Sequence, residues 1–221
     1  QNRAMDSGMQ TALRDLYRRR FGAAPDRLLP LHGDASSRRL FRVYGAAGTA
    51  IGVLGPDPLE NRAFLSFSKT FRAAGLPVPE IFGEDPEAGV YLEEDLGDTT
   101  LFDMLNAGRR GFSPDEATIA AYREALRLLP RFQIEAGQGI DYGVCHPRAA
   151  FDRQSMLWDL NYFKDYFLKL AAIPFSEQAL EDDFERFAGL LLAAPREHFL
   201  YRDFQSRNIM VRDGKPWFID Y

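Results

Sequence analysis

The sequence predicts an α+β fold, with a small antiparallel sheet in the first part of the chain and a mainly helical second part. Up to residue 94, short apolar runs rich in branched and aromatic residues alternate with Gly, Pro and Asp, as in strands joined by turns. Beyond residue 95, apolar residues recur at helical spacing over long stretches. These patterns divide the chain into two expected lobes, residues 1–94 and residues 95–221.

In the first lobe, one helix is expected before the sheet and one within it. Residues 5–21 carry apolar side chains at helical spacing and an arginine-rich outer face. A second helix is expected over residues 58–73, because Pro58 suits a helix start and Gly75 suits a helix end. Strands are expected over residues 28–31, 40–44, 49–54, 81–82 and 90–93.

The second lobe is expected to consist of helices followed by one hairpin. The hairpin signal is Asp213-Gly214, because both residues tolerate the positive φ angles of a tight turn. It joins two short apolar runs, at residues 209–211 and 216–219. The helices are expected over residues 99–107, 114–135, 152–171 and 176–193.

Composition narrows the class of protein. The chain has 221 residues, of which 46% are hydrophobic and 27% charged, and its net charge is −5, so it does not have the basic character of a nucleic-acid-binding protein. It has one cysteine, which excludes an internal disulfide and fits a reducing compartment. No apolar run is long enough to span a bilayer or to form a signal peptide. We therefore expect a soluble cytoplasmic protein with no nucleic-acid or membrane partner, and composition indicates no particular oligomeric state.

Three polar residues near the end of the chain form the candidate catalytic centre. Asp203 and Asn208 lie five positions apart, which is the spacing of the catalytic-loop Asp and Asn in phosphoryl-transfer enzymes. The expected hairpin returns Asp220 to Asn208, and Mg²⁺ favours such hard oxygen donors, completed by phosphate and water. Asp203 remains available to accept a proton from a hydroxyl group. Together they predict a magnesium-dependent phosphoryl-transfer site.

The chain resembles a known superfamily in several stretches. These are residues 198–221, which contain the catalytic pattern, and residues 33–43, 75–79 and 92–98. They resemble the aminoglycoside phosphotransferase and choline kinase-like superfamily, and most closely the bacterial anomeric kinases that phosphorylate N-acetylmuramate and N-acetylglucosamine at C1. The resemblance implies a protein-kinase-like, two-lobed fold with an N-terminal nucleotide-binding lobe and a C-terminal catalytic lobe. It also implies that the catalytic lobe is incomplete in this chain, since such folds continue for several more helices.

The phosphate-binding end of the expected nucleotide site lies in the turn at residues 33–39. Its small residues allow backbone amides to approach an anion, and Ser36 and Ser37 offer hydroxyl donors. The turn is not a Walker A loop, because Gly-Lys-Ser and Gly-Lys-Thr are both absent. A plain hairpin is the alternative interpretation.

The third strand departs from the superfamily pattern, because residues 49–55 contain no lysine to pair with the nucleotide phosphates. A guanidinium binds phosphate bidentately, so we expect Arg38 or Arg39 to replace the lysine. The alternative is that these arginines lie on a solvated face. Glu60 best matches the glutamate that pairs with the lysine in this superfamily, although it equally suits a helix N-terminus.

Two further sets of residues are candidates for ligand binding. At the expected lobe boundary, Glu94 and Leu96 are candidates for backbone contacts with adenine; an ordinary linker is the alternative. For the acceptor we expect polar and aromatic residues on the helix at 152–171 and in the catalytic segment, although core packing is the default role of that helix's aromatic stripe. The acceptor candidates are Asp152, Arg153, Trp158, Asp159, Gln205 and Arg207.

The sequence as a whole therefore predicts a small-molecule kinase. It is expected to use ATP and Mg²⁺ to transfer the γ-phosphoryl group to a hydroxyl group, with an amino sugar as the acceptor. One alternative is a kinase-like binding or regulatory module without turnover, suggested by the absent lysine and by the end of the chain at Tyr221. Another is the same chemistry on choline, homoserine, a ketosamine or an aminoglycoside.

Overall fold

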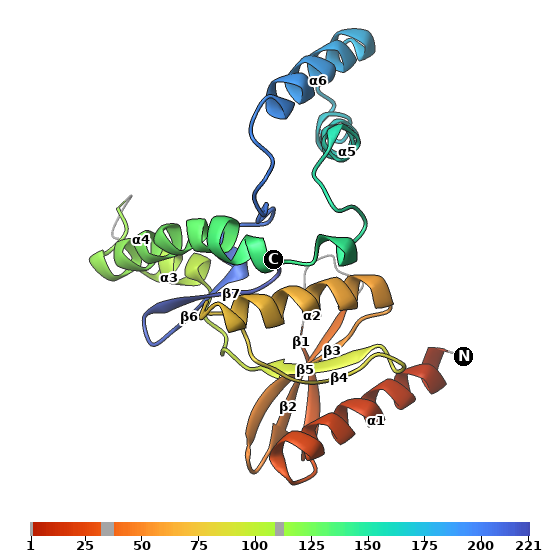
Figure 1. Ribbon diagram of the computed structural model, residues 1–221, viewed down its shortest axis with the longest axis vertical. Helices are drawn as coiled ribbons and strands as arrows, with labels where there is room; N and C mark the ends of the chain where they lie inside the picture. The colour runs from red at the N-terminus through yellow and green to blue at the C-terminus, as the bar shows by residue number, and fades with distance from the viewer. Residues whose placement is uncertain (1, 32–37, 109–112) are drawn as a thin grey trace. The chain divides into compact units, whose positions relative to one another are not determined.

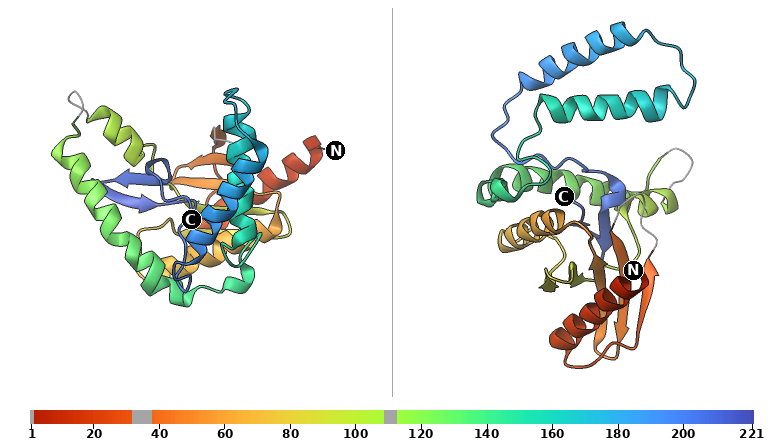
Figure 2. Two further views of the ribbon diagram at one scale, coloured as in Figure 1. Left: turned by 90° about the horizontal axis from the view of Figure 1, so that it is seen from above. Right: turned by 90° about the vertical axis from the view of Figure 1, so that its right-hand side faces the viewer.

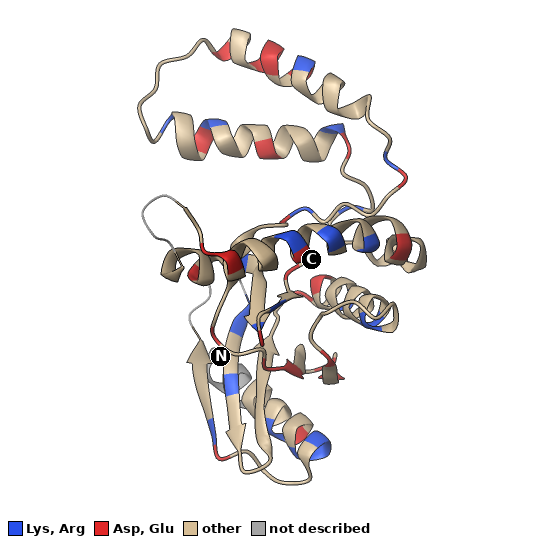
Figure 3. Cartoon of the chain, turned by 90° about the vertical axis from the view of Figure 1, so that its left-hand side faces the viewer, with Lys and Arg blue, Asp and Glu red and all other residues tan. Residues whose placement is uncertain are grey.

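The computed structural model describes residues 2–31, 38–108 and 113–221. By its contacts the chain divides into two compact units, one formed by residues 1–147 with 201–221 and the other by residues 148–200. This division differs from the expected lobes, whose boundary at residue 94 stays a prediction. Among the described helices, none is long and apolar enough to cross a membrane. Lys and Arg are interspersed with Asp and Glu over the described elements (Figure 3).

The first unit contains a five-stranded antiparallel sheet with the strand order β1-β2-β3-β5-β4 (Figure 1). The expected strands are all present, and β4 is longer than expected. Helices α1 (Asn2–Phe21) and α2 (Pro58–Ala73) lie on opposite faces of the sheet (Figures 1 and 2). The strands are β1 (Arg27–Leu31), β2 (Arg39–Gly45), β3 (Gly48–Leu54), β4 (Ile81–Asp85) and β5 (Val90–Glu94).

Residue alternation along the strands gives the sheet two different faces. One face packs against α1 around the fully buried side chains of Leu13, Tyr17 and Val43. The Tyr17 hydroxyl donates a hydrogen bond to the Gly48 carbonyl at 2.7 Å. On the other face, Val53 and Tyr91 pack against Phe64 and Leu65 of α2.

The elements that follow the sheet in the first unit agree with the expected helices and hairpin, with one change of helix type. Asp213 and Gly214 both have positive φ, as expected for the tight turn between β6 and β7. The helix expected over 114–135 changes from α to π geometry directly after Pro130, which lacks the N–H needed for a helical hydrogen bond. The elements are α3 (Leu101–Ala107), α4 (Glu116–Pro130), η1 (Arg131–Glu135), η2 (Ala136–Gly139), η3 (Tyr142–Val144), η5 (Ser206–Asn208), β6 (Ile209–Arg212) and β7 (Lys215–Phe218).

An aromatic core joins these later elements to α2. The ring centroids of Phe71 on α2 and Phe132 on η1 are 4.9 Å apart, and Phe132 lies 4.9 Å from Phe218 on β7. All three side chains are fully buried. The ring centroid of Tyr221 lies 4.9 Å from that of Phe71, and the Tyr221 hydroxyl group donates a hydrogen bond to Ser68 Oγ at 2.6 Å. The last residue of the sequence is therefore fixed to α2.

The second unit consists of α5 (Arg153–Phe163), η4 (Lys164–Leu168) and α6 (Glu177–Leu192). The expected helix over 152–171 is thus an α-helix that ends in a π turn, and the one over 176–193 is confirmed. Five aromatic side chains on the first of these helices are exposed by between 43% and 65%, contrary to the expected core packing. They are Trp158, Tyr162, Phe163, Tyr166 and Phe167.

A buried carboxyl group lies on β5, on the α2 side of the sheet. The Oε2 atom of Glu93 is buried and has no hydrogen-bond partner among the described residues. Loss of solvation raises the pKa of Glu93 from 4.5 to about 8, and the negative charge of Asp220 acts in the same direction, while Arg38 opposes both. At neutral pH this carboxyl group is therefore largely protonated.

We expect Phe71→Ala to lower the free energy of unfolding by about 3–5 kcal/mol, because it leaves a cavity in the aromatic core. Urea unfolding measures the effect. Leu59→Ala is a matched control on the same helix, where the side chain is 55% exposed, and it should change stability by no more than about 0.5 kcal/mol. Equal losses in both variants would contradict the packing described.

We expect the stability of the protein to depend on pH through Glu93. Between pH 4.5 and about 8 the unfolded chain has released this proton and the folded chain retains it, so each unit of rising pH lowers stability by about 1.4 kcal/mol. Glu93→Gln removes this term, and its advantage over the wild type should grow from pH 5 to pH 8. Urea unfolding at several pH values measures it, and parallel curves for the two proteins would exclude a raised pKa.

Candidate functional site

The catalytic loop, residues 201–208, is held by the aromatic core at one end and by its own backbone at the other. Tyr201 is buried, with its ring 5.6 Å from that of Phe132, and its hydroxyl group donates to the Ile219 carbonyl at 2.9 Å. Within the loop, Gln205 N–H donates to the Asp203 carbonyl at 2.8 Å, and Asn208 N–H donates to the Gln205 carbonyl at 2.9 Å. These turns leave the Asp203 side chain exposed.

The hairpin brings Asp220 to Asn208, as the sequence predicts. Strands β6 and β7 pair from Ile209 with Phe218 onward, and Ile219 N–H donates to the Asn208 carbonyl at 3.1 Å. The Asn208 side-chain amide then donates to the Asp203 carbonyl at 3.2 Å and to Asp220 Oδ2 at 3.5 Å. The three predicted residues thus meet in one place.

Asp220 has an unusual backbone and an unusual carboxyl group. Its φ angle is +56°, a conformation that residues other than glycine seldom adopt and that often occurs at functional sites. Removal from solvent raises the pKa of its carboxyl group, and the nearby negative charges of Asp203 and Glu60 act in the same direction. Arg38 is the opposing positive charge. An additional cation in this place would relieve the repulsion.

The residues present suit a magnesium ion better than a transition metal. Among the described residues, no group of three or more His, Cys, Asp or Glu side chains is arranged to hold a metal. The donors that converge are instead one carboxylate, from Asp220, and one carboxamide, from Asn208. Mg²⁺ is usually bound by one or two such protein oxygens, with water and phosphate completing its coordination.

Arg38 forms an ion pair with Glu60, the residue expected to pair with the cation at the phosphate end. The Arg38 Nη2 atom lies 3.2 Å from Glu60 Oε1 in the first turn of α2, and the guanidinium lies 5.2 Å from the ring centroid of Phe64. The Arg38 side chain is only 12% exposed. Its charge acts on both Asp220 and Glu93, so one guanidinium lies among three carboxyl groups.

The other residues expected at the phosphate end are Ser36, Ser37 and Arg39. Arg39 is the first residue of β2, and its guanidinium lies 5.4 Å from the ring centroid of Phe41. Ser36 and Ser37 fall outside the described residues.

The segment expected to bind adenine connects β5 to α3. Glu94 N–H is already used in a hydrogen bond to the Glu80 carbonyl at 2.9 Å. Leu96 is 6% exposed, and its backbone N–H and C=O form no hydrogen bond within the described part of the chain.

The acceptor candidates are divided between the two units. Asp152 caps α5 by accepting from Ser155 N–H at 3.0 Å and forms an ion pair with Arg148, whose guanidinium lies 5.7 Å from the Trp158 ring centroid. Arg153 joins α5 to α6 through Glu185. These residues and the exposed Asp159 belong to the second unit.

The remaining two acceptor candidates belong to the catalytic loop in the first unit. Gln205 and Arg207 are both exposed, and the Arg207 guanidinium lies 4.1 Å from the ring centroid of Phe102 on α3.

The sequence reasoning missed Glu93 as part of the site. Its signal was available, since Tyr91 and Glu93 alternate onto the same face of β5, where a charged residue is unexpected. The fixation of Tyr221 by Ser68 had no comparable signal, because the two residues are 153 positions apart.

Sequence comparison identifies the family and relatives of the chain. The profile of the phosphotransferase enzyme family matches residues 27–221. An N-acetylmuramate/N-acetylglucosamine kinase of Pseudomonas aeruginosa is 30% identical over 202 residues, which cover 89% of this chain and 55% of that protein. The protein of the same name from Pseudomonas putida is 28% identical and is covered to 59%, with 95% of this chain aligned. The chain thus spans little more than half the length of these relatives.

Solved structures share the fold. A thermostable mutant of aminoglycoside phosphotransferase APH(4)-Ia, in a ternary complex with AMP-PNP and hygromycin B, has a TM-score of 0.57 at 14% identity, covering 95% of this chain and 70% of that one. Plasmodium vivax ethanolamine kinase has a TM-score of 0.53 at 17% identity, covering 88% and 56%. The predicted protein-kinase-like fold is thereby confirmed. Because the family profile extends over almost the entire sequence, the chain belongs to the phosphotransferase enzyme family.

Proposed function

We propose that this chain forms the nucleotide-binding and catalytic part of a small-molecule kinase. It transfers the γ-phosphoryl group of ATP to a hydroxyl group of an amino sugar in a magnesium-dependent reaction. The observation that carries this proposal is the convergence of Asp203, Asn208 and Asp220, with Asn208 bonded to both of the others. In this assignment residues 1–94 are the nucleotide-binding lobe and residues 95–221 belong to the catalytic lobe.

Asp203 acts on the acceptor. As the acceptor oxygen forms its bond to the γ-phosphorus, the bond from phosphorus to the bridging oxygen breaks, ADP leaves, and the hydroxyl proton passes to the Asp203 carboxylate. The exposed position of this side chain suits a group that must reach a bound substrate. Proton transfer of this kind contributes roughly 10²–10⁴ in rate.

The nucleotide is held by groups that are already in place. Asn208 and Asp220 would bind Mg²⁺, which when bound neutralises charge on the phosphate oxygens. Arg38 takes the role of the absent strand lysine, because its ion pair with Glu60 fixes it close to Asp220. Leu96 presents its backbone N–H and C=O to the adenine edge.

The amino-sugar acceptor is supported by the names of three relatives, all of which are N-acetylmuramate/N-acetylglucosamine kinases. A direct test incubates the natural full-length protein with ATP, Mg²⁺ and a panel of amino sugars, choline, homoserine, a ketosamine and an aminoglycoside. Phosphorylated amino sugar, detected by mass spectrometry, is the expected product. ATP binding without any product would instead favour a regulatory module.

Replacing Asp203 with Ala should lower kcat by roughly 10²–10⁴, because the acceptor proton loses its base. The dissociation constant for ATP with Mg²⁺, measured by calorimetry, should remain within about twofold because the nucleotide ligands are intact. Asp213→Asn is the control, since Asn tolerates the positive φ of that turn, and its turnover should match the wild type. Unchanged turnover in Asp203→Ala would falsify the assigned role.

Asp220→Ala should act on the metal instead of the proton. In the wild type, Mg²⁺ should strengthen ATP binding, and this effect should disappear in the variant because one of the two oxygen donors is lost. Calorimetric titrations of ATP with and without Mg²⁺ measure the difference. An intact magnesium effect in Asp220→Ala would assign the metal to other residues.

A further inference from the structure

The connection between β5 and α3 is fixed from one side by Arg42 on β2. The Arg42 Nε and Nη2 atoms lie 2.8 and 3.1 Å from the two carboxylate oxygens of Asp95. Nη1 lies 2.7 Å from Asp98 Oδ1, and Nη2 also donates to the Gly97 carbonyl at 3.1 Å. One guanidinium thus contacts three of the four residues from Asp95 to Asp98.

The side chains of Arg42 and Asp95 form a largely buried ion pair. Their side chains are 13% and 7% exposed, whereas Asp98 is 80% exposed. Partial burial by itself lowers the pKa of Arg42, but the hydrogen bonds and charges of Asp98 and Asp95 raise it by more. Charge-assisted hydrogen bonds from Arg42 to Asp95 and Asp98, with the Nε atom close to the second Asp95 oxygen, fix the orientation of the guanidinium as well as its distance.

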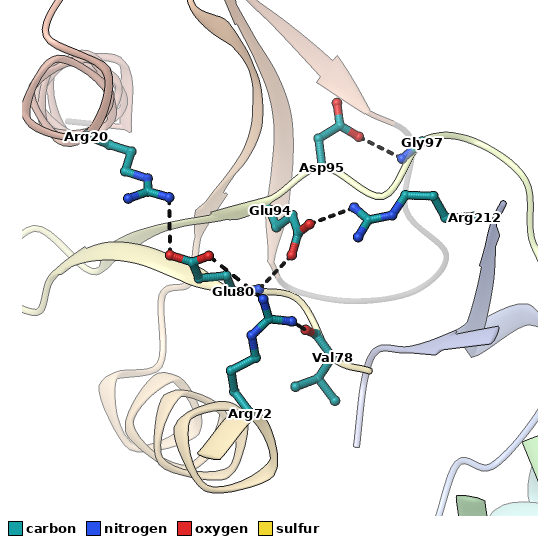
Figure 4. Close-up of polar contacts among 8 residues, drawn as sticks. All are labelled: Arg20, Arg72, Val78, Glu80, Glu94, Asp95, Gly97 and Arg212. Carbon is teal, nitrogen blue, oxygen red and sulfur yellow. Dashed lines mark hydrogen bonds and ion pairs between the residues drawn. The ribbon is translucent and has the colours of Figure 1, made fainter. Parts of the chain in front are cut away.

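The same connection is fixed at its start by a second arginine, from β6. Arg212 Nη1 lies 2.6 Å from Glu94 Oε1, while Glu94 Oε2 accepts from Glu80 N–H at 3.2 Å (Figure 4). Asp95 Oδ1 also accepts from Gly97 N–H at 3.0 Å (Figure 4). That turn requires Gly97, whose φ angle is +86°.

Leu96 lies between these anchored residues, with its side chain buried and its backbone N–H and C=O not hydrogen-bonded within the described chain. A purine presents a donor and an acceptor side by side, so a backbone that binds it must hold its own groups at a set spacing. Buried ion pairs add little net stability, and they are better suited to fixing one geometry.

We propose that Arg42 is a positioning residue for the nucleotide base, and that Arg212 assists it through its ion pair with Glu94. Arg42 contacts no nucleotide itself. It fixes Asp95, Gly97 and Asp98, and thereby aims the Leu96 backbone at the base. The inference rests on the proposed function. It adds the residues that set the affinity for the nucleotide base, which are different from those that bind the phosphates.

The experiment compares two probes by calorimetry in the presence of Mg²⁺, ATP and inorganic tripolyphosphate. Arg42→Met should weaken ATP binding by at least about tenfold and tripolyphosphate binding by less than about twofold, because only ATP uses the connection. Arg42→Lys should give an intermediate loss, since it restores the charge but not the simultaneous contacts with Asp95, Gly97 and Asp98. Arg27→Met is the control: Arg27 is an exposed arginine on β1 that packs on Tyr44, and the variant should bind both probes as the wild type does.

Several outcomes overturn the inference. Equal losses for ATP and tripolyphosphate in Arg42→Met would indicate general damage to the fold, and wild-type affinity for ATP would show that the pair has no role in binding. If Arg42→Met does not fold, as judged by circular dichroism, Arg212→Met and Arg42→Lys provide the same comparison. A wild-type protein that binds no ATP contradicts the proposed function itself, whereas the other outcomes contradict only this inference.

Discussion

The packing of aromatic rings between α2, η1 and β7 is the constraint on which the rest of the site depends. The catalytic loop and the hairpin are too short to bury a core of their own. They are ordered because the rings of Tyr201 and Phe218 pack against Phe132, which packs in turn against Phe71. Aromatic pairs at these distances add directional contacts to the burial of apolar area. The polar site is therefore positioned by an apolar interaction beneath it.

Electrostatics add a second constraint on top of this core. Arg38 is the cation shared by Glu60, Asp220 and Glu93, and the carboxyl groups it does not neutralise shift towards their protonated forms. An excess of acidic groups around one guanidinium contributes little to the stability of a fold. The same excess of negative charge suits the binding of a divalent cation together with the phosphates that accompany it.

Local sequence signals were sufficient for most of the architecture and for the centre of the site. The turn at Asp213-Gly214 and the spacing of Asp203 and Asn208 depend on neighbouring residues only, so they could be read directly. The pairing of Arg42 with Asp95 could not, because it depends on which strands become neighbours in the sheet and how far a side chain reaches across them. The ion pair of Arg38 with Glu60 could not be read directly either, because it depends on how the start of α2 lies against the residue that precedes β2.

The helix α2 carries both ends of the arrangement on a single rigid body. Glu60 in its first turn holds Arg38, and Ser68, two turns later, holds Tyr221, the neighbour of Asp220. A tilt of this helix would displace the Arg38 guanidinium and the Asp220 carboxylate together. The positions of Arg38 and Asp220 are therefore coupled through α2. Distant mutations that change the packing of α2 should displace both groups together.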